Sequence, residues 1–416
     1  IWPMIFDSNR PWCITANGTI FTYDKEAVIP GLLKRWYAER KDMQARLREA
    51  INAGDKEQEE YWDKRQLVKK INLNSLYGAI LNPGCRFFDK RIGQSTTLTG
   101  RSIARHMDAY VNECVTGRYD HMGDAIIYGD TDSCYFSAWP AVRAEVAEGR
   151  MEWNKEICIA LYNSIADQIN ESFPGFMEQA FHCPRELGSV IRGGREIVAT
   201  KGLFITKKRY AVLYIDKENK RQDVNGKPGK IKAMGLDLKR SDTPKVIQEF
   251  LSDILDDVLN GARRDAIVEK IREFKYKFTE RPGWEKGSPK RVNNLTKYGK
   301  EEERLGKANM PGHVRAALNW NTMRKMQGDN YSMQIVDGMK VIVCKLKKNP
   351  MGMTSIAYPT DEHRLPYWFK ELPFDDAEME ATVIDGKVDN LLGVLDWDLG
   401  SATNTENQFT SLFSFE

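Results

Sequence analysis

The sequence predicts an α+β fold, and three patterns indicate it. Helical periodicity runs over residues 30–53 and again over 57–80, with Gly54 and Asp55 between the two stretches. Two short apolar runs, 125–127 and 134–136, flank a polar turn, which is typical of an antiparallel hairpin. From Asp242 onwards the pattern is mostly helical. Because a 416-residue chain exceeds the size at which single cores stop growing, we expect two or three subdomains.

The elements can be justified in chain order. Residues 12–21 predict a short strand and a turn at Asn17-Gly18, and the two long helices that follow are antiparallel because only a two-residue turn joins them. A helix over 94–114 precedes the hairpin, and another over 152–179 follows it. Further on, the sequence predicts strands around Ile197 and over 209–214, an apolar helix over 246–259, and a charged stretch with Gly and Pro over 280–312.

The polar turn of the hairpin is the first candidate site. It reads Tyr128, Gly129, Asp130, Thr131, Asp132, Ser133. Side chains at i and i+2 leave an extended segment on the same face, so both carboxylates would point into one cleft. Hard oxygen ligands on a rigid backbone suit Mg²⁺ and two-metal phosphoryl transfer. Asp-Thr-Asp alone is also ordinary turn chemistry, so the interpretation needs a second motif.

A helical stripe upstream supplies that motif. Lys70, Asn74 and Tyr77 fall at i, i+4 and i+7 and therefore share one helix face, with Gly78 beside them. A cation, an amide and an aromatic ring suit the phosphates, the sugar and the base of a nucleotide. An amphipathic helix with a solvated Lys and a core Tyr would show the same spacing.

Taken in order, these motifs resemble those of family B DNA polymerases, closest to the T-even phage replicative type. The stretch 70–78 is similar to the family's fingers motif, and 128–133 to its metal-binding palm motif. Arg195-Glu196-Ile197 resembles a segment that brings another carboxylate to the site. Residues 207–210 look like the motif that grips the minor groove of the primer-template. Thr243-Pro244-Lys245 and residues 311–315 fit the thumb.

The resemblance implies a right-hand fold and a DNA-directed DNA polymerase that uses two Mg²⁺ ions. The expected subdomains are a palm fragment (1–27), helical-hairpin fingers (28–82), an antiparallel palm sheet with the catalytic hairpin (83–240), a mostly helical thumb (241–400) and a flexible tail (401–416). The implied site residues are Asp130, Asp132 and Glu196 for catalysis, with the two Asp as metal ligands; Arg40, Lys70, Asn74 and Tyr77 for the deoxynucleoside triphosphate; and Lys207, Lys208, Arg209 and Tyr210 for DNA.

One family motif is absent from the sequence. Family B enzymes carry another metal-binding Asp in an Asp-x-x-Ser-Leu-Tyr-Pro motif, whereas the only Ser-Leu-Tyr here is Ser75 to Tyr77. The family's N-terminal and exonuclease domains are missing as well. We therefore expect a partial reading frame, a processed product or one member of a split polymerase. We expect the chain alone to be inactive or nearly so, and to need an N-terminal half, as a separate chain in a split polymerase, to supply the missing Asp.

Composition and the C-terminal residues complete the expectations. The net charge is +3, but residues 201–232 are basic and suit phosphate, although a solvated strand face is equally compatible. The absence of a signal-like N-terminus or a long apolar run predicts the cytoplasm of a bacterial host cell, without membrane contact. The tail would bind a sliding clamp or fold back on the chain, with Leu412, Phe413 and Phe415 as anchors.

Two functional alternatives remain open at this stage. A reverse transcriptase or RNA polymerase would use similar palm chemistry, although the fingers stripe and residues 207–210 fit the DNA-templated family better. A non-catalytic fragment that binds DNA and the clamp is the second alternative.

Overall fold

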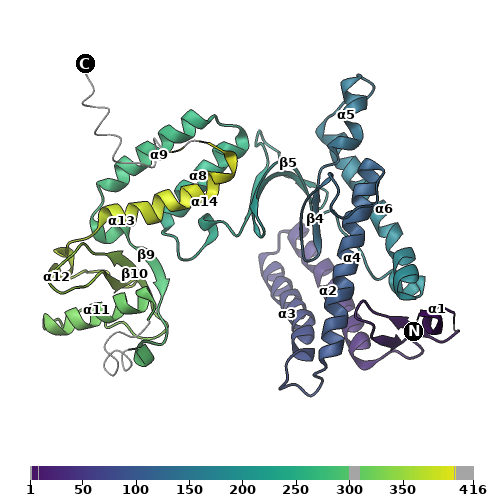
Figure 1. Cartoon of the computed structure of the whole chain (residues 1–416), viewed down its shortest axis with the longest axis horizontal. Helices are drawn as coiled ribbons and strands as arrows, with labels where there is room; N and C mark the ends of the chain where they lie inside the picture. The colour runs from purple at the N-terminus through teal and green to yellow at the C-terminus, as the bar shows by residue number, and fades with distance from the viewer. Residues whose placement is uncertain (1, 8, 299–309, 398, 400–416) are drawn as a thin grey trace. The chain divides into compact units, whose positions relative to one another are not determined.

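The computed structural model describes residues 2–7, 9–298, 310–397 and 399. They form two compact units, residues 1–196 and 197–416 (Figure 1). The division falls inside the segment 83–240 that the sequence analysis assigns to one subdomain. The anchors Leu412, Phe413 and Phe415 lie outside the described residues. None of the described helices is long and apolar enough to span a membrane.

The first unit opens with small elements and a long helical hairpin. Helix α1 (Trp2–Phe6) precedes strands β1 (Trp12–Ile14) and β2 (Ile20–Thr22), which pair antiparallel as predicted. Helices α2 (Val28–Ala53) and α3 (Lys56–Ile80) then lie side by side (Figure 1). Gly54 ends α2 in the left-handed conformation at φ 71°, and the Asp55 side chain accepts the Gln58 N–H at 3.0 Å to cap α3. Both predicted helices are confirmed.

The rest of the first unit packs two helices against a hairpin. Helix α4 (Lys90–Thr116) starts earlier than predicted, because the Asp89 side chain caps it by accepting the Arg91 N–H at 2.8 Å. The core contains Val111 and Val115 from α4, Ala125 before the hairpin, and Ile169 and Phe173 from the next long helix. The remaining elements are the hairpin strands β3 (Ile126–Asp130) and β4 (Ser133–Phe136), the unpredicted helix α5 (Trp139–Ala147), α6 (Lys155–Phe181) and the short α7 (Arg185–Gly188).

The second unit begins with an antiparallel sheet. Strand β6 (Arg209–Lys217) is central, and β5 (Ile197–Thr206) and β8 (Lys230–Met234) pair with it on either side, while the short β7 (Lys220–Arg221) pairs with its end. A 3-10 turn, η1 (Asp237–Lys239), leads to helices α8 (Lys245–Asn260) and α9 (Arg264–Thr279), which share a core with the sheet.

A second sheet lies where the sequence predicted a mostly helical thumb. Strands β9 (Ser288–Arg291), β10 (Lys340–Lys345) and β11 (Ser355–Pro359) form an antiparallel sheet in the order β11-β10-β9, with α11 (Gly312–Met326) packed on it. The helical prediction missed these strands, whose partners lie far apart in the sequence. The other elements are η2 (Gly283–Lys286), α12 (Tyr367–Lys370), α13 (Asp376–Glu380), the π-helical turn η3 (Ala381–Asp385), α14 (Gly386–Leu392) and η4 (Gly393–Leu395).

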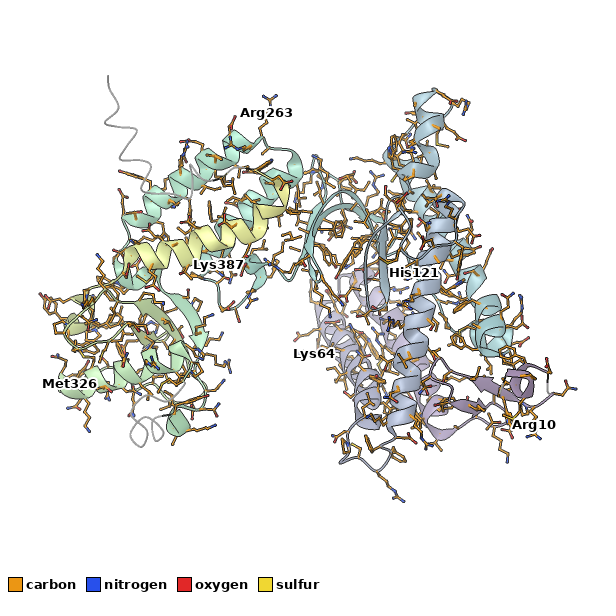
Figure 2. The ribbon with its side chains drawn as sticks, viewed as in Figure 1. Arg10, Lys64, His121, Arg263, Met326 and Lys387 are labelled. Atoms are coloured by element: carbon orange, nitrogen blue, oxygen red, sulfur yellow. The ribbon has the colours of Figure 1, made fainter. Side chains whose placement is uncertain are left out.

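The segment from α13 to α14 joins the two cores of the second unit. Met379 belongs to the core around the β9–β11 sheet, and Val383 and Val388 belong to the core around α8 and α9. Figure 2 shows the side chains of both units, with Met326 at the end of α11 and Lys387 on α14.

Candidate active site

The Asp-Thr-Asp turn has a specific and uncommon backbone geometry. Asp130 pairs with Ser133 in the β3–β4 ladder, so Thr131 and Asp132 form a two-residue loop. Thr131 has φ 56°, and the Asp132 N–H donates to the Asp130 carbonyl at 2.6 Å. A β-branched residue at positive φ is rare, and such strain costs about 1–3 kcal/mol. The sequence predicted an extended backbone from Asp130 to Asp132. This is wrong, because Thr131 and Asp132 form the turn.

The turn presents its two carboxylates differently. Asp130 is half-buried at the end of β3, where the Thr131 hydroxyl donates to its Oδ1 at 3.2 Å. The Ser133 hydroxyl donates to the Asp130 carbonyl oxygen at 3.2 Å, which braces the turn from its other side. Asp132 is exposed. The chain thus offers one carboxylate held by its neighbours and one directed to solvent.

These donors suit a magnesium ion that also binds substrate. The described part of the chain holds no cluster of three or more His, Cys, Asp or Glu side chains that could bind a metal. Mg²⁺ is commonly held by one or two carboxylates, with water and substrate phosphates completing its octahedron. Asp130 and Asp132 fit that donor set, whereas a second ion would need further oxygen ligands.

Helix α4 supports the β3–β4 hairpin through side chains that the sequence did not predict as part of the site. The buried Asn112 accepts the Ala125 N–H at 3.1 Å and donates to the Arg118 carbonyl at 2.9 Å. Its amide lies so close to Gly123 that a Cβ there would meet Nδ2 at 2.1 Å. The loop entering β3 is therefore fixed by one side chain and one glycine.

A second α4 residue lies under the turn itself. A Cβ on Gly129 would sit 3.5 Å from Asp108 Oδ2, and Asp108 Oδ1 is buried without a hydrogen-bond partner among the described residues. Burial raises the pKa of this carboxyl, and burial beside Asp108 also raises the pKa of the Cys134 thiol. A charged residue on the apolar face of an amphipathic helix is the sequence signal that could have revealed Asp108.

The predicted triphosphate-binding residues share the α2–α3 hairpin. Lys70 and Asn74 are exposed on one face of α3, and the Tyr77 hydroxyl shares a 2.7 Å hydrogen bond with Thr97 of α4. Arg40 of α2 is half-buried and donates from Nε to Gln66 Oε1 of α3 at 3.4 Å. The exposed face therefore carries a cation and an amide, with a ring tethered at its end.

The neighbour of Lys70 has a different environment. The ammonium of Lys69 pairs with Glu39 and lies 5.5 Å from the centre of the Trp36 ring, so this cation is used within the hairpin. At the end of the first unit Glu196 is exposed, and its neighbour Arg195 donates from Nε to Asn163 at 2.8 Å.

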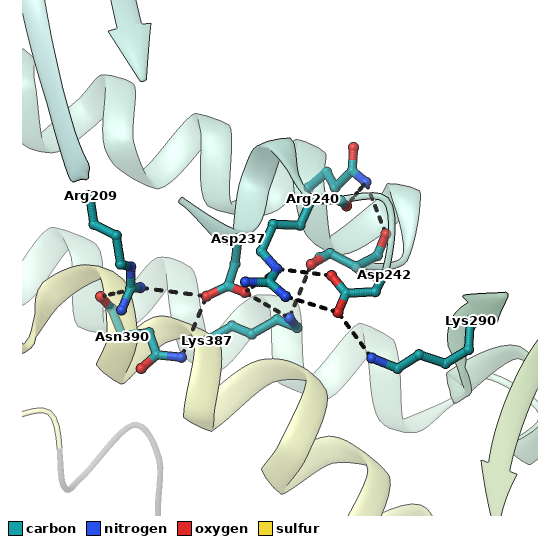
Figure 3. A network of polar contacts seen from close by, with 9 residues as sticks. Arg209, Asp237, Arg240, Asp242, Lys290, Lys387 and Asn390 are labelled. Atoms are coloured by element: carbon teal, nitrogen blue, oxygen red, sulfur yellow. Dashed lines mark hydrogen bonds and ion pairs between the residues drawn. The ribbon is translucent and has the colours of Figure 1, made fainter. Parts of the chain in front are cut away.

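The predicted DNA-binding residues divide into two kinds. Lys207 and Lys208 form the exposed two-residue turn between β5 and β6, with Lys208 at φ 65°. Arg209 instead donates to the Asn390 carbonyl at 3.2 Å and faces Asp237 at 3.7 Å (Figure 3). Tyr210 is buried and stacks on Phe204 at 5.6 Å between ring centres. Arg209 and Tyr210 are thus engaged within the protein.

Comparisons with known proteins agree with the motifs. Residues 13–166 match the family described as DNA polymerase family B. A DNA-directed DNA polymerase of Enterobacteria phage T4 is 30% identical over 315 residues, which cover 71% of this chain and 33% of the relative. The chain belongs to DNA polymerase family B. The resemblance found from the sequence is confirmed.

Other members of the family match over similar stretches. The DNA-directed DNA polymerase of Escherichia phage RB69 is 29% identical, over 71% of this chain and 33% of its own length. DNA polymerase 1 of Pyrococcus abyssi is 26% identical, over 63% of this chain and 28% of its own length. This family B chain therefore spans about a third of the length of the two phage relatives it matches.

Proposed function

We propose that this chain provides the nucleotidyl-transfer part of a viral replicative DNA polymerase, which adds deoxynucleotides to a primer 3′ end on a DNA template. The observation that carries the proposal is the β3–β4 turn, in which a family B chain presents Asp130 and Asp132 on a braced, strained backbone. Strain of this kind persists where the surrounding structure imposes it, and it clusters at functional sites.

Most of the predicted site residues have a role in this proposal. Asp132, with Asp130 beside it, binds the metal ions, and Glu196 adds negative charge nearby. Mg²⁺, when bound, would neutralise the triphosphate and activate the primer hydroxyl for in-line attack on the α-phosphorus, with release of pyrophosphate. Arg40, Lys70 and Asn74 hold the triphosphate, and Tyr77 packs against the new base pair. The exposed lysines of the β5–β6 turn contact the DNA backbone or minor groove.

The subdomain assignment belongs to the same proposal. We assign residues 1–27 and 83–240 to the palm, 28–82 to the fingers and 241–400 to the thumb. Two features support the fingers and palm assignments, namely the α2–α3 helical hairpin and the antiparallel strands around the Asp turn. The thumb then combines helices with the β9–β11 sheet. Residues 401–416 would bind a sliding clamp.

The metal site is incomplete in these 416 residues, because the sequence lacks the Asp-x-x-Ser-Leu-Tyr-Pro motif. We propose that the third carboxylate comes from the N-terminal part of a polymerase, supplied as a separate chain. If its loss weakens transition-state stabilisation by about 4 kcal/mol, the rate falls roughly a thousandfold. The chain alone should then be nearly inactive.

The test is Mg²⁺-dependent primer extension by this chain mixed with the matching N-terminal half. Extension should need both chains and should be abolished by Asp132→Asn. Asp124→Asn is the matched control, since Asp124 is an exposed carboxylate in the loop before the same hairpin, and it should leave extension unchanged. Normal extension by the chain alone would refute the need for a partner. An RNA template that is copied better than DNA would refute the DNA-templated assignment.

The second candidate function is a non-catalytic fragment that binds DNA and the clamp. The exposed lysine turn favours it, because duplex binding does not require the Asp turn. In that case no partner chain restores extension, while primer-template binding persists in Asp132→Asn.

A further inference from the structure

Asp237 is the centre of a polar network in the second unit. Its side chain is 13% exposed and faces three donors from two other parts of the chain. The Lys387 ammonium lies 3.1 Å from Oδ1, the Asn390 amide nitrogen 3.4 Å from Oδ2 and the Arg209 guanidinium 3.7 Å from Oδ2 (Figure 3). Lys387 and Asn390 project from α14, and Arg209 is the first residue of β6. One carboxylate therefore links the sheet to the last long helical segment.

The position of Asp237 is fixed by its neighbours in the sequence. Leu236 and Leu238 are 1% and 7% exposed, and both belong to the core around α8 and α9. Alternate apolar burial holds the carboxylate between them in place. Asp237 is thus an acceptor anchored between two core residues.

The segment that carries Asp237 also lies directly against the lysine turn. Gly235 has φ 64°, and a Cβ there would meet the Lys208 carbonyl oxygen at 2.0 Å. Arg209 follows Lys208 in the chain and donates to the Asn390 carbonyl at 3.2 Å. The turn is therefore held on one side by backbone contact with Gly235 and on the other by the guanidinium of Arg209.

The two contacts of Arg209 favour its place in the network over an alternative use of this side chain. Two carboxylates, Asp237 and Asp242, serve four cations, namely Arg209, Arg240, Lys290 and Lys387. If Arg209 reached for a phosphate, it would leave both its carboxylate and its carbonyl acceptor. Staying in place keeps the strand end at the position that the lysine turn needs.

We propose that Arg209 anchors the Lys207-Lys208 turn through Asp237 instead of contacting DNA, which makes Asp237 a positioning residue for duplex binding. The inference rests on the proposed function, in which the lysine turn binds primer-template DNA. Asp237 would then promote the binding of DNA, a polyanion, although it is itself negatively charged.

The test compares two Asp→Asn variants of the whole chain that change charge equally. Asp223 pairs at 2.8 Å with Arg221, which lies in β7 of the same sheet, and Arg221 is 34% exposed, close to the 30% of Arg209. Electrostatics alone would make both Asp237→Asn and Asp223→Asn bind duplex DNA at least as tightly as the wild type. Anchoring predicts that Asp237→Asn alone binds about tenfold more weakly, because the lysines lose their positions.

Fluorescence anisotropy with a labelled primer-template, over a series of salt concentrations, separates these outcomes. In Asp237→Asn the slope of log affinity against log salt should fall by about one, since fewer counterions are released. Arg209→Lys keeps the positive charge but loses the length and the planar donor arrangement of the guanidinium. It should weaken DNA binding as much as Asp237→Asn does. It serves as the second variant if Asp237→Asn does not fold.

Each outcome decides the proposal. Equal or tighter binding by Asp237→Asn, or unchanged binding by folded Arg209→Lys, would overturn the anchoring role while leaving duplex binding intact. If the wild-type chain itself does not bind primer-template DNA, the proposed function fails and the anchoring role fails with it.

Discussion

Lys286→Met should destabilise the second unit strongly. Lys286, in η2, is 1% exposed, and its ammonium lies 3.0 Å from the Thr279 carbonyl and 3.2 Å from Glu380 Oε1. Thr279 ends α9 and Glu380 ends α13, so one cation joins elements of both cores. Asp376 Oδ1 is 3.3 Å from the same ammonium; this oxygen is buried and has no hydrogen-bond partner among the described residues, although the side chain as a whole is 47% exposed.

The expected magnitude follows from burial. Removing one partner of a buried ion pair costs about 3–5 kcal/mol, because the other charge is left without compensation. Met is apolar and similar in length, so the change is chiefly electrostatic. For a unit of this size, about 2–4 °C per kcal/mol translates the loss into a fall in melting temperature of roughly 6–20 °C. The double variant Lys286→Met, Glu380→Gln should lose less than the single one, since it removes both charges.

Urea unfolding measures the loss of free energy of unfolding. Hydrogen exchange of peptides that cover η2 and α13 shows where in the chain the loss occurs. Lys345→Met is the control, because Lys345 pairs with Glu378 at 2.7 Å while both side chains are more than 40% exposed. That pair should contribute about 0–1 kcal/mol. A loss in Lys286→Met no larger than in Lys345→Met would refute the reasoning.

Three further predictions concern single contacts. Gly235→Ala should destabilise the chain by more than about 1 kcal/mol and weaken duplex binding, because the new Cβ would overlap the Lys208 carbonyl oxygen. A variant with the melting temperature and DNA affinity of the wild type would contradict this. Asn112→Ala should cost about 1–3 kcal/mol by leaving the Ala125 N–H unpaired, and should lower extension more than DNA binding. Burial raises the pKa of Asp329, but hydrogen bonds, first from Ser332, hold it at about 2. Because the pKa of Asp329 is lower in the folded chain than in the unfolded chain, its carboxylate should stabilise the fold fully above about pH 4, and this stabilisation should be lost as the pH falls towards 2. The urea midpoint of the wild type should therefore fall over this pH range, and that of Asp329→Asn should lack this fall.

The parts of the fold that the sequence predicted are those encoded by adjacent residues. Helices α2 and α3 were found because Gly54 and Asp55 supply the end of one helix and the cap of the next within two positions. The β9–β11 sheet was missed because β9 contains Pro289 and only four residues, and its partner begins at Lys340. No local periodicity marks such a strand, since its stability comes from a pairing that spans the intervening α11.

In the candidate site too, the sequence predicted what adjacent residues encode and missed what distant residues impose. Asp130 and Asp132 could be found because the turn and its flanking apolar runs are contiguous. The positive φ of Thr131 could not, since Thr strongly disfavours it and the hairpin around it imposes it. Asn112 acts through a hydrogen bond across thirteen positions that no spacing rule predicts.

The basic motif at residues 207–210 shows why charge in a sequence overstates the surface available to DNA. The four residues look equivalent as a DNA-binding string, yet Tyr210 is 8% exposed and Arg209 faces a carboxylate whose neighbours Leu236 and Leu238 are buried. A cation with a fixed acidic partner can reach a phosphate only by breaking that ion pair. Lys207 and Lys208 instead lie exposed at the turn between two strands. The number of phosphates that this motif neutralises should therefore follow its two turn lysines. We expect the slope of log affinity against log salt to fall by about one for Lys207→Ala and for Lys208→Ala, and to stay unchanged for Arg221→Met.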